Sequence, residues 1–126
     1  MAHYTGIDMI EIPRIRKALA RWGEVFLRRI YTEAEIQRYR AKPSSLAARF
    51  ACKEAVMKLL GTGRRGVNWR EIETLSHPSG KPVVRLYGRA KDKAEALGVT
   101  EINVSLSHSK EYAIASVIGS TEAEGA

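Results

Sequence analysis

The stretch between Ser44 and Gly61 carries four charged side chains on an otherwise apolar pattern that is typical of a helix. These charged residues are Arg49, Lys53, Glu54 and Lys58. At 100° per residue they fall between a bulky apolar side and a side of small residues, so the continuous polar face of a surface helix is missing. We therefore expect a helix that is buried over most of its circumference. Charges in such a place are costly unless they are paired with each other, with a metal or with a ligand.

The charges on this helix do not balance, because three cations stand against one carboxylate. One interpretation is internal pairing, of Glu54 with Lys58 at a spacing of four residues and of Arg49 or Lys53 with a carboxylate elsewhere. The other is a bound anion, for which phosphate is the simplest candidate. A carboxylate fits a phosphate site when it holds Mg²⁺, which takes one or two protein carboxylates together with phosphate oxygens and water.

Asp8 is the best candidate for a second carboxylate. It follows an apolar segment, residues 3–7, whose pattern predicts a strand that ends near Asp8. From spacing alone, a loop or capping aspartate is the commoner role. Glu11 is a rival, although its position directly before Ile12-Pro13 suits the start of a helix.

A glycine-rich segment, Gly61-Thr62-Gly63, follows the charged helix and allows a close approach of the backbone to a ligand. It is not a Walker loop, which precedes its helix. The C-terminal end of a helix disfavours an anion. Phosphate near this segment must therefore be held by side-chain cations, loop N–H groups and a metal.

Ser107 and His108 gather polar groups at the end of a predicted strand, residues 102–106. Ordinary turn chemistry accounts for them. Neither a serine-hydrolase elbow nor a paired-histidine zinc motif accompanies His108, so a hydrolase has little support.

Positive charge is concentrated near the start of the chain, which carries +7 overall. Residues 14–42 hold nine basic and three acidic residues, hence +6 of the total. In the helix expected from Pro13 to about Phe26, the basic residues Arg14, Lys17 and Arg21 lie roughly 120–140° from the apolar face. A solvated basic face is one interpretation. A docking surface for an acidic protein, nucleic acid or an anionic membrane is the other.

The element pattern predicts an α+β fold, with helices packed on a small, mostly antiparallel sheet. Thr32 and Glu35 form a capping box that opens a second helix, and Ser44 or Ser45 caps the third. Further helical and strand patterns cover residues 89–97 for a helix and 72–75, 83–87, 102–106 and 112–118 for strands. We expect a single domain over residues 1–118 and a frayed tail over 119–126.

The composition, with 44% hydrophobic and 28% charged residues, suits one compact soluble domain, and we expect a cytoplasmic protein. No apolar run approaches the roughly 20 residues that span a bilayer, and the first residues lack a signal-peptide pattern. The single cysteine, Cys52, cannot form an internal disulfide, which suits a reducing compartment.

Together these segments resemble the bacterial holo-[acyl-carrier-protein] synthase family, the small AcpS-type 4′-phosphopantetheinyl transferases. The matching segments are Gly6–Ile12, Arg49–Ala55 with Lys58, Gly61–Gly63, Trp69 with Ile72-Glu73, Gly80–Pro82 and Ser105–Ser109. Two residues depart from the family pattern: Tyr4 stands where glycine is frequent, and Cys52 where alanine is usual. Neither is a proposed ligand.

The resemblance implies a Mg²⁺-dependent enzyme of fatty acid biosynthesis that transfers phosphopantetheine from coenzyme A to a serine of apo-acyl carrier protein. Asp8 and Glu54 match the two magnesium-binding carboxylates, and with Lys58 they are the expected catalytic residues. The expected coenzyme A-binding residues are Arg49, Lys53, Lys58, Gly61, Thr62, Gly63, Ser107 and His108.

The family resemblance also implies partners. Arg14, Lys17 and Arg21 match the surface that binds the acidic carrier protein. The family typically forms homotrimers with active sites between subunits, so a homotrimer is expected here, and neither nucleic acid nor a membrane is expected as a partner.

Two alternatives belong to other classes of protein. A small nucleic-acid-binding module is compatible with the basic helix and with Trp22, Tyr31 and Tyr39, but it leaves Asp8 and Glu54 unexplained. A subunit that binds the carrier protein or coenzyme A without activity is the second.

Overall fold

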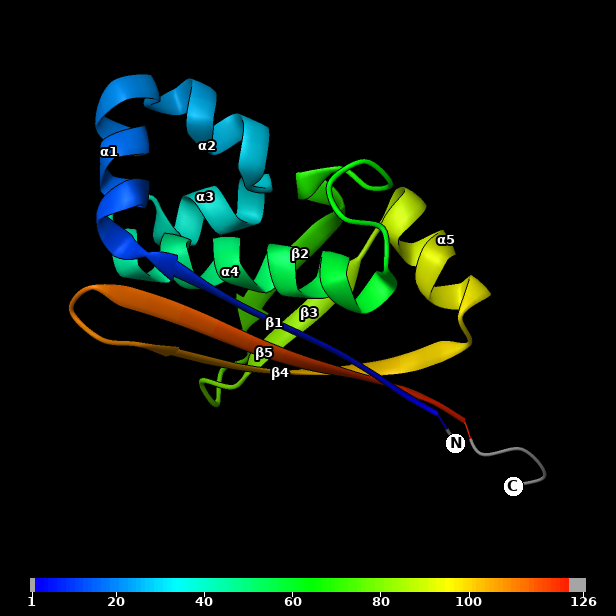
Figure 1. Cartoon of the computed structure of the whole chain (residues 1–126). Coiled ribbons are helices and arrows are strands. Elements are labelled where there is room, and N and C mark those ends of the chain that lie inside the picture. Colours follow the sequence, from blue (N-terminus) through cyan, green and yellow to red (C-terminus); the bar gives the residue numbers. More distant parts are fainter. Residues whose placement is uncertain (1, 123–126) are drawn as a thin grey trace.

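The computed structural model describes residues 2–122, which form helices packed against two small antiparallel sheets (Figure 1). The helices are α1 (Ile12–Trp22), α2 (Glu24–Ile30), α3 (Glu33–Tyr39), α4 (Pro43–Leu60) and α5 (Gly88–Ala96), with a 3₁₀ turn, η1 (Trp69–Glu71). The strands are β1 (His3–Glu11), β2 (Ile72–Ser76), β3 (Pro82–Leu86), β4 (Val99–His108) and β5 (Tyr112–Thr121). The predicted α+β fold is confirmed.

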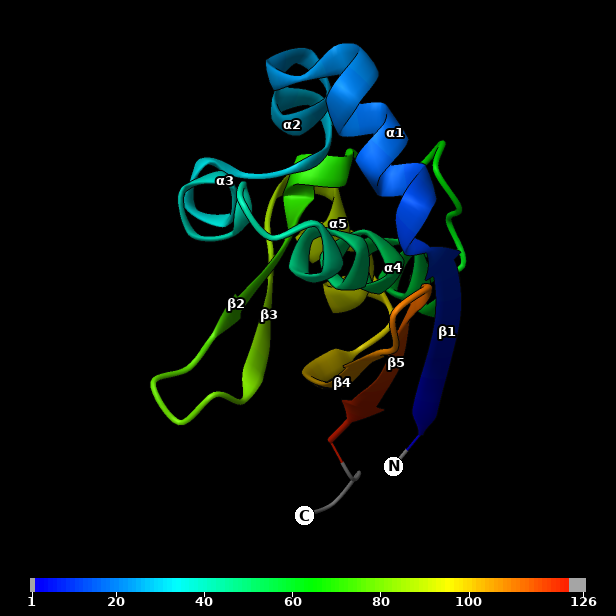
Figure 2. The same ribbon diagram turned by 90° about the vertical axis from the view of Figure 1, so that its left-hand side faces the viewer.

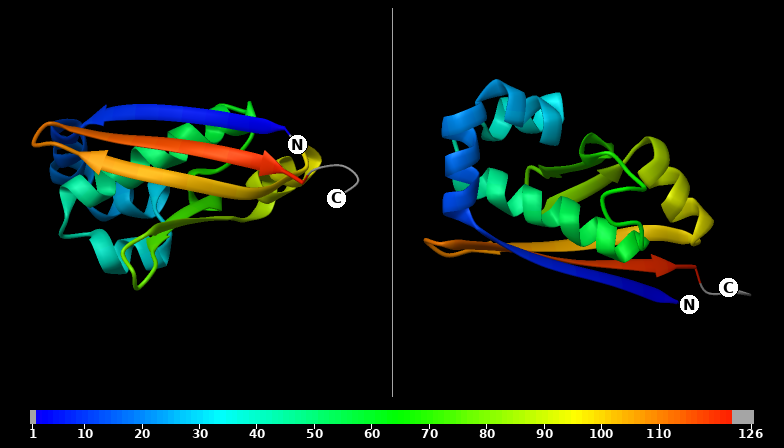
Figure 3. Two further views of the ribbon diagram at one scale, coloured as in Figure 1. Left: turned by 90° about the horizontal axis from the view of Figure 1, so that it is seen from below. Right: turned by 45° about the horizontal axis from the view of Figure 1, so that its top comes forward.

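The larger sheet has three strands in the order β1-β5-β4, and β2 and β3 form a separate hairpin. Helix α4 packs across one face of the larger sheet, mainly on β1 and β5 (Figure 2). The opposite face of this sheet is free of helices, as the view from below shows (Figure 3). The sheet therefore has an inner face, against α4, and an outer face.

Alternation along β5 explains which side chains each face presents. Ala113, Ala115 and Val117 are fully buried on the inner face, where small side chains let α4 come close. Their neighbours Ile114 and Ile118 point to the outer face and are 36% and 46% exposed.

Gly6 sets the closest approach between β1 and α4. A Cβ atom at this position would collide with the backbone carbonyl of Ala55, so only glycine lets the strand lie directly on the helix. Asp8 lies two residues further along β1 and therefore on the same inner face.

Helix α4 is the centre of the core, as its pattern predicts. Of its eighteen residues, all described, Lys58 is the one that is exposed, and Ala51, Cys52 and Ala55 have no exposed surface. The helix ends at Gly61, whose positive φ of 73° forms the expected left-handed cap.

Several expected boundaries were wrong. The first helix was expected to continue to about Phe26, but it stops at Trp22 because Gly23, with φ 52°, turns the chain into α2. Trp22 is 55% exposed at this end of the helix. Helix α4 starts at Pro43 without a side-chain cap from Ser44 or Ser45.

Four of the five strands in the described residues are longer than their patterns predicted, because pairing with neighbours extends them, and β3 keeps its predicted length but is shifted by one residue. Asp8 lies inside β1, opposite Ala115, and does not follow the strand. Residues 119–121, expected in a frayed tail, continue β5 and pair with β1 and β4. Residues 123–126 of that tail lie outside the described residues. No helix in the described range 2–122 has the length and apolar character to cross a membrane.

Candidate active site

Asp8 and Lys58 meet where β1 crosses α4. The Lys58 ammonium group donates to Asp8 Oδ1 at 3.0 Å and to the Ile7 carbonyl oxygen at 2.8 Å. The Asp8 side chain is 21% exposed and that of Lys58 is 55% exposed. Lys58 thus lies at the rim of the site, where the Ile7 carbonyl oxygen holds its ammonium group, and the Asp8 carboxylate is more buried.

Glu54 lies on the same face of α4 as Lys58, because four residues make about one helical turn. Its side chain is 15% exposed, and Arg64, from the loop after α4, donates to Glu54 Oε1 through Nε at 3.0 Å. The pairing of Glu54 with Lys58 that the spacing suggested is replaced by two others: Lys58 pairs with Asp8, and Glu54 with Arg64. Two carboxylates and two cations therefore balance at this crossing.

The donor set fits a hard divalent cation. Asp8 pairs with Lys58, and Glu54 precedes Lys58 by one helical turn, so each offers carboxylate oxygens on the Lys58 side of α4. One or two carboxylates are the contribution a protein usually makes to a Mg²⁺ site. Residues 2–122 contain no group of three or more histidine, cysteine, aspartate or glutamate side chains that could hold a metal. A metal on Asp8 and Glu54 would therefore complete its coordination with oxygens from substrate and water.

Lys53 lies in the core. It has no exposed surface, and its ammonium group donates to Glu35 Oε1 at 2.8 Å, to the Trp69 carbonyl at 3.1 Å and to the Ile72 carbonyl. Burial lowers the pKa of Lys53, and the Glu35 carboxylate opposes that shift. The prediction that Lys53 binds coenzyme A is therefore corrected, because its donors are used inside the fold.

Arg49 lies on the opposite side of α4 from Lys58, since nine residues rotate about 180° at 100° per residue. Its guanidinium group donates to the Thr74 carbonyl and to Ser76 Oγ, each at 3.1 Å, and stacks 3.7 Å from the centre of the Tyr39 ring. Arg49 is 6% exposed. The excess of cations that suggested a bound anion is thus largely compensated within the chain.

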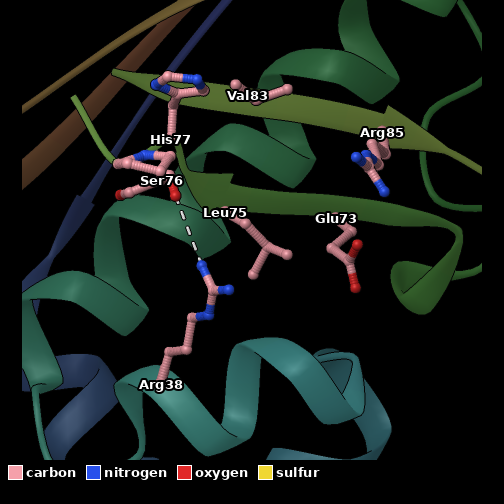
Figure 4. A pocket seen from close by; sticks show the side chains of 8 residues that line it. Arg38, Glu73, Leu75, Ser76, His77, Val83 and Arg85 are labelled. Atoms are coloured by element: carbon pink, nitrogen blue, oxygen red, sulfur yellow. Dashed lines mark hydrogen bonds between the residues drawn. The ribbon is translucent and has the colours of Figure 1, made fainter. Parts of the chain in front are cut away.

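Beyond Arg49, a pocket of about 350 Å³ opens between α3 and the β2–β3 hairpin (Figure 4). Ser76, the hydrogen-bond partner of Arg49, lines it. Arg38 reaches into it from α3 and donates to the Ser76 carbonyl at 3.4 Å, and Arg85 stands on β3 across from Glu73. Nothing in the sequence pattern predicted this pocket.

The other expected ligand residues lie at two places. Gly61, Thr62 and Gly63 directly follow the turn that carries Lys58, so they adjoin the crossing of β1 and α4. Ser107 and His108 end β4 and point to opposite faces of the sheet, since Ser107 pairs with Ile114 and His108 with Ala113.

The basic helix is exposed as predicted. Arg14, Lys17 and Arg21 all lie on the solvent side of α1. Next to them is an apolar pocket of about 380 Å³, whose lining residues are Trp22, Val25, Phe26, Arg29, Ile30, Phe50 and Trp69. Phe50 and Trp69 stack with ring centres 4.9 Å apart, and Trp69 also lies beneath the Arg64 guanidinium group. Through Trp69, this apolar pocket adjoins Arg64, the ion-pair partner of Glu54.

Cys52 has no reactive character. It is buried, accepts a hydrogen bond from the Thr74 hydroxyl group, and burial raises the pKa of its thiol to about 11. A buried thiol of this kind fills space in the core and is not nucleophilic.

Comparison with known proteins identifies the protein family of this chain. The model of the 4′-phosphopantetheinyl transferase superfamily matches residues 4–117. The chain belongs to this superfamily. Within it, the holo-[acyl-carrier-protein] synthase of Dehalococcoides mccartyi is 55% identical over 115 residues, which cover 91% of this chain and 96% of that protein. That of Herpetosiphon aurantiacus is 50% identical over 122 residues, with the same two coverages.

Solved structures of phosphopantetheinyl transferases agree with this family membership. The holo-[acyl-carrier-protein] synthase of Helicobacter pylori in complex with coenzyme A superimposes with a TM-score of 0.83 at 33% identity, covering 92% of this chain and 99% of that one. The enzyme from Neisseria meningitidis gives a TM-score of 0.82 at 32% identity, covering 94% and 98%. The predicted family is confirmed, and a nucleic-acid-binding module is not favoured.

Two ion-pair partners of the predicted site residues were missed from the sequence. Glu35 was recognised only as part of a capping box, which the structure confirms, and its bond to Lys53 depends on how α3 docks on α4. Arg64 follows the glycine-rich segment, and nothing in its spacing from Glu54 predicts an ion pair.

Proposed function

We propose that this chain transfers the 4′-phosphopantetheine group from coenzyme A to a serine hydroxyl group of apo-acyl carrier protein. The products are holo-acyl carrier protein and adenosine 3′,5′-bisphosphate. One observation carries the proposal: Lys58 pairs with Asp8 where β1 crosses α4, and Glu54 lies one turn before Lys58 on the same face of α4. They do so in a chain that matches holo-[acyl-carrier-protein] synthases over nearly its whole length.

The reaction forms a bond from the serine oxygen to the β-phosphorus of coenzyme A and breaks the bond from that phosphorus to the oxygen bridging to the α-phosphate. Such transfer depends on positioning and charge neutralisation more than on covalent catalysis by the protein. Asp8 and Glu54 would hold Mg²⁺, which when bound neutralises negative charge on the pyrophosphate. Lys58 presents its ammonium group at the rim, where it stabilises charge on a phosphate oxygen. The serine proton passes to Asp8, to Glu54 or to water.

The carrier protein docks on α1 in this account. Arg14, Lys17 and Arg21 attract acidic side chains and steer the approach, which raises the association rate at low salt. The apolar pocket beside Trp22 and Phe50 offers a place for apolar side chains of the same partner. The serine would then be delivered to the Glu54 side of that pocket.

Coenzyme A would lie along the turn Gly61–Gly63 and Lys58, with Arg49, Ser107 and His108 serving another part of the molecule. Within one chain these groups face different directions, since Arg49 is on the far side of α4 from Lys58 and Ser107 is on the outer face of the sheet. Sites shared between subunits would bring such groups to one ligand.

A homotrimer accordingly forms part of the proposal. The outer face of the three-stranded sheet exposes five apolar side chains, and a surface of this kind is typical of an interface. They are Ile7, Met9, Tyr112, Ile114 and Ile118. Ser107 lies on this same face, opposite Ile114, so association there would place it at a subunit boundary. We further expect the chain to act in the cytoplasm.

Incubation with coenzyme A, Mg²⁺ and apo-acyl carrier protein tests this function. Mass spectrometry of the carrier protein should show the phosphopantetheine increment. Absence of the increment together with tight RNA binding would support a nucleic-acid-binding module. Binding of coenzyme A without transfer would support an inactive subunit.

A further inference from the structure

Arg64 connects Glu54 with Trp69. Its guanidinium group directs Nε and Nη2 to the same oxygen, Glu54 Oε1, at 3.0 and 2.5 Å. The guanidinium carbon also lies 5.3 Å from the centre of the Trp69 ring, within cation–π range. One side chain thus contacts a proposed metal ligand and a wall of the apolar pocket.

The Glu54 carboxylate lies mostly inside the protein and Arg64 mostly outside it, with side chains 15% and 65% exposed. An exposed arginine loses little when its ion pair opens, because water solvates the freed charge and surface pairs contribute little to stability. The loop that carries Arg64 contains Gly61, Gly63 and Gly66, so few side chains hinder its movement.

Lys58, the other cation of the site, is held differently. Besides Asp8 it binds the Ile7 carbonyl oxygen, so it keeps a partner when the carboxylate is engaged elsewhere. Within residues 2–122, the Arg64 guanidinium group forms hydrogen bonds and an ion pair with Glu54 only, and its one further contact of this kind is the cation–π contact with the Trp69 ring. Of the two cations, Arg64 is the one that a competing charge can displace.

We propose that Arg64 is a displaceable counter-cation, which holds Glu54 in place, competes with the divalent metal for its carboxylate and leaves it when the metal binds. The inference rests on the proposed metal-binding role of Asp8 and Glu54. A guanidinium and a divalent cation repel each other at one carboxylate oxygen, so both cannot occupy Oε1 closely. Because Arg64 also covers Trp69, its departure changes the surroundings of that ring and links metal binding to the wall of the apolar pocket.

Calorimetric titration with Mg²⁺ alone tests the competition. Arg64→Met removes the charge and keeps most of the length of the side chain. Arg65→Met is the control: it removes the same charge from the next exposed residue, whose side chain makes none of the ion pairs found in residues 2–122. We expect Arg64→Met to bind Mg²⁺ about two- to fivefold more tightly than Arg65→Met, which is the effect of opening one partly exposed ion pair. Equal affinity in the two variants, or weaker binding in Arg64→Met, would overturn the inference.

Fluorescence of Trp69 tests the release. Trp22 and Trp69 are the two tryptophans of the sequence, so Trp22→Phe isolates the signal. Addition of Mg²⁺ should change the Trp69 emission of the Trp22→Phe protein, and the Mg²⁺ concentration at half-change should match the one found by calorimetry. The emission of Trp22→Phe/Arg64→Met should stay nearly constant. The same change in both proteins would contradict the release of Arg64.

A third variant separates this inference from the proposed function. Glu54→Gln should abolish Mg²⁺ binding. If wild-type protein binds no Mg²⁺, or if Glu54→Gln binds it as the wild type does, the proposed metal site fails and the inference with it. If Glu54→Gln loses the metal while Arg64→Met matches Arg65→Met, only the inference fails.

Discussion

Gly6 of β1 lies directly against the backbone carbonyl of Ala55 in α4, with no room for a Cβ between them. This contact fixes the distance between the strand that carries Asp8 and the turn of helix that carries Glu54. The position of Asp8 relative to α4 therefore depends on glycine at residue 6.

We predict that Gly6→Ala separates β1 from α4. It should lower the free energy of unfolding by about 1–3 kcal/mol, as an overpacked core does. The protein that remains folded should also transfer phosphopantetheine more slowly than wild type. Urea denaturation and transfer rates measure the two effects. Thr5→Ala, at the neighbouring exposed position on the outer face, is the control and should leave transfer within twofold. Full activity in Gly6→Ala would show that the crossing does not position Asp8.

The buried pair of Lys53 and Glu35 should act on stability and not on ligand binding. Lys53→Met leaves the Glu35 carboxylate buried without its cation, so we expect a loss of about 3–5 kcal/mol in the free energy of unfolding. The double variant Lys53→Met/Glu35→Gln removes both charges and should recover part of that loss. A Lys53→Met protein that is as stable as wild type and defective only in coenzyme A binding would restore the ligand role that the structure removes.

Charge reversal on α1 should weaken the binding of the carrier protein and leave the binding of coenzyme A unchanged. Arg14→Glu with Arg21→Glu is expected to raise the KM for carrier protein by about tenfold or more at low salt, with a smaller effect at high salt because screening weakens steering. The KM for coenzyme A should stay the same. Lys91→Glu with Lys93→Glu changes the charge equally on exposed positions of α5 and is the matched control. An unchanged KM for carrier protein in the α1 variant would move the docking surface elsewhere.

The outer face of the sheet should hold subunits together. Ile114→Glu places a charge in the middle of that face, where a buried unpaired charge is costly, so it should convert a trimer into monomers and abolish transfer. Light scattering after size-exclusion chromatography gives the mass. Val83→Glu, an equally drastic change at another exposed apolar residue, should leave the mass as in wild type. A monomeric wild-type protein with full activity would contradict sites shared between subunits.

Local features of the sequence predicted much of this molecule. The capping box at Thr32 and Glu35, the buried character of α4 and its stop at Gly61 follow from propensity and periodicity, and all are confirmed. The first helix ends at Gly23, which has a positive φ of 52°, although the apolar period runs across it. The extension of β1 depends on its pairing with β5, whose residues lie more than a hundred positions away and so fall outside any local window.

The site shows the same division between local and long-range information. The helical spacing placed Glu54 and Lys58 on one face, and the family resemblance joined Asp8 to them. Lys53 was misjudged because its partner, Glu35, sits on a different helix at eighteen residues' separation. A charge on a buried helix can be satisfied by protein or by ligand, and only the tertiary packing distinguishes the two.

Transfer of phosphopantetheine by matched variants tests the central claim most directly. Purified wild type, Asp8→Ala and Glu54→Ala are incubated with coenzyme A, Mg²⁺ and apo-acyl carrier protein, and the carrier protein is weighed by mass spectrometry. The account predicts the phosphopantetheine increment with wild type, its loss when EDTA removes the metal, and no increment with either variant. A folded wild-type protein without transfer, or a variant that transfers at the wild-type rate, would contradict it.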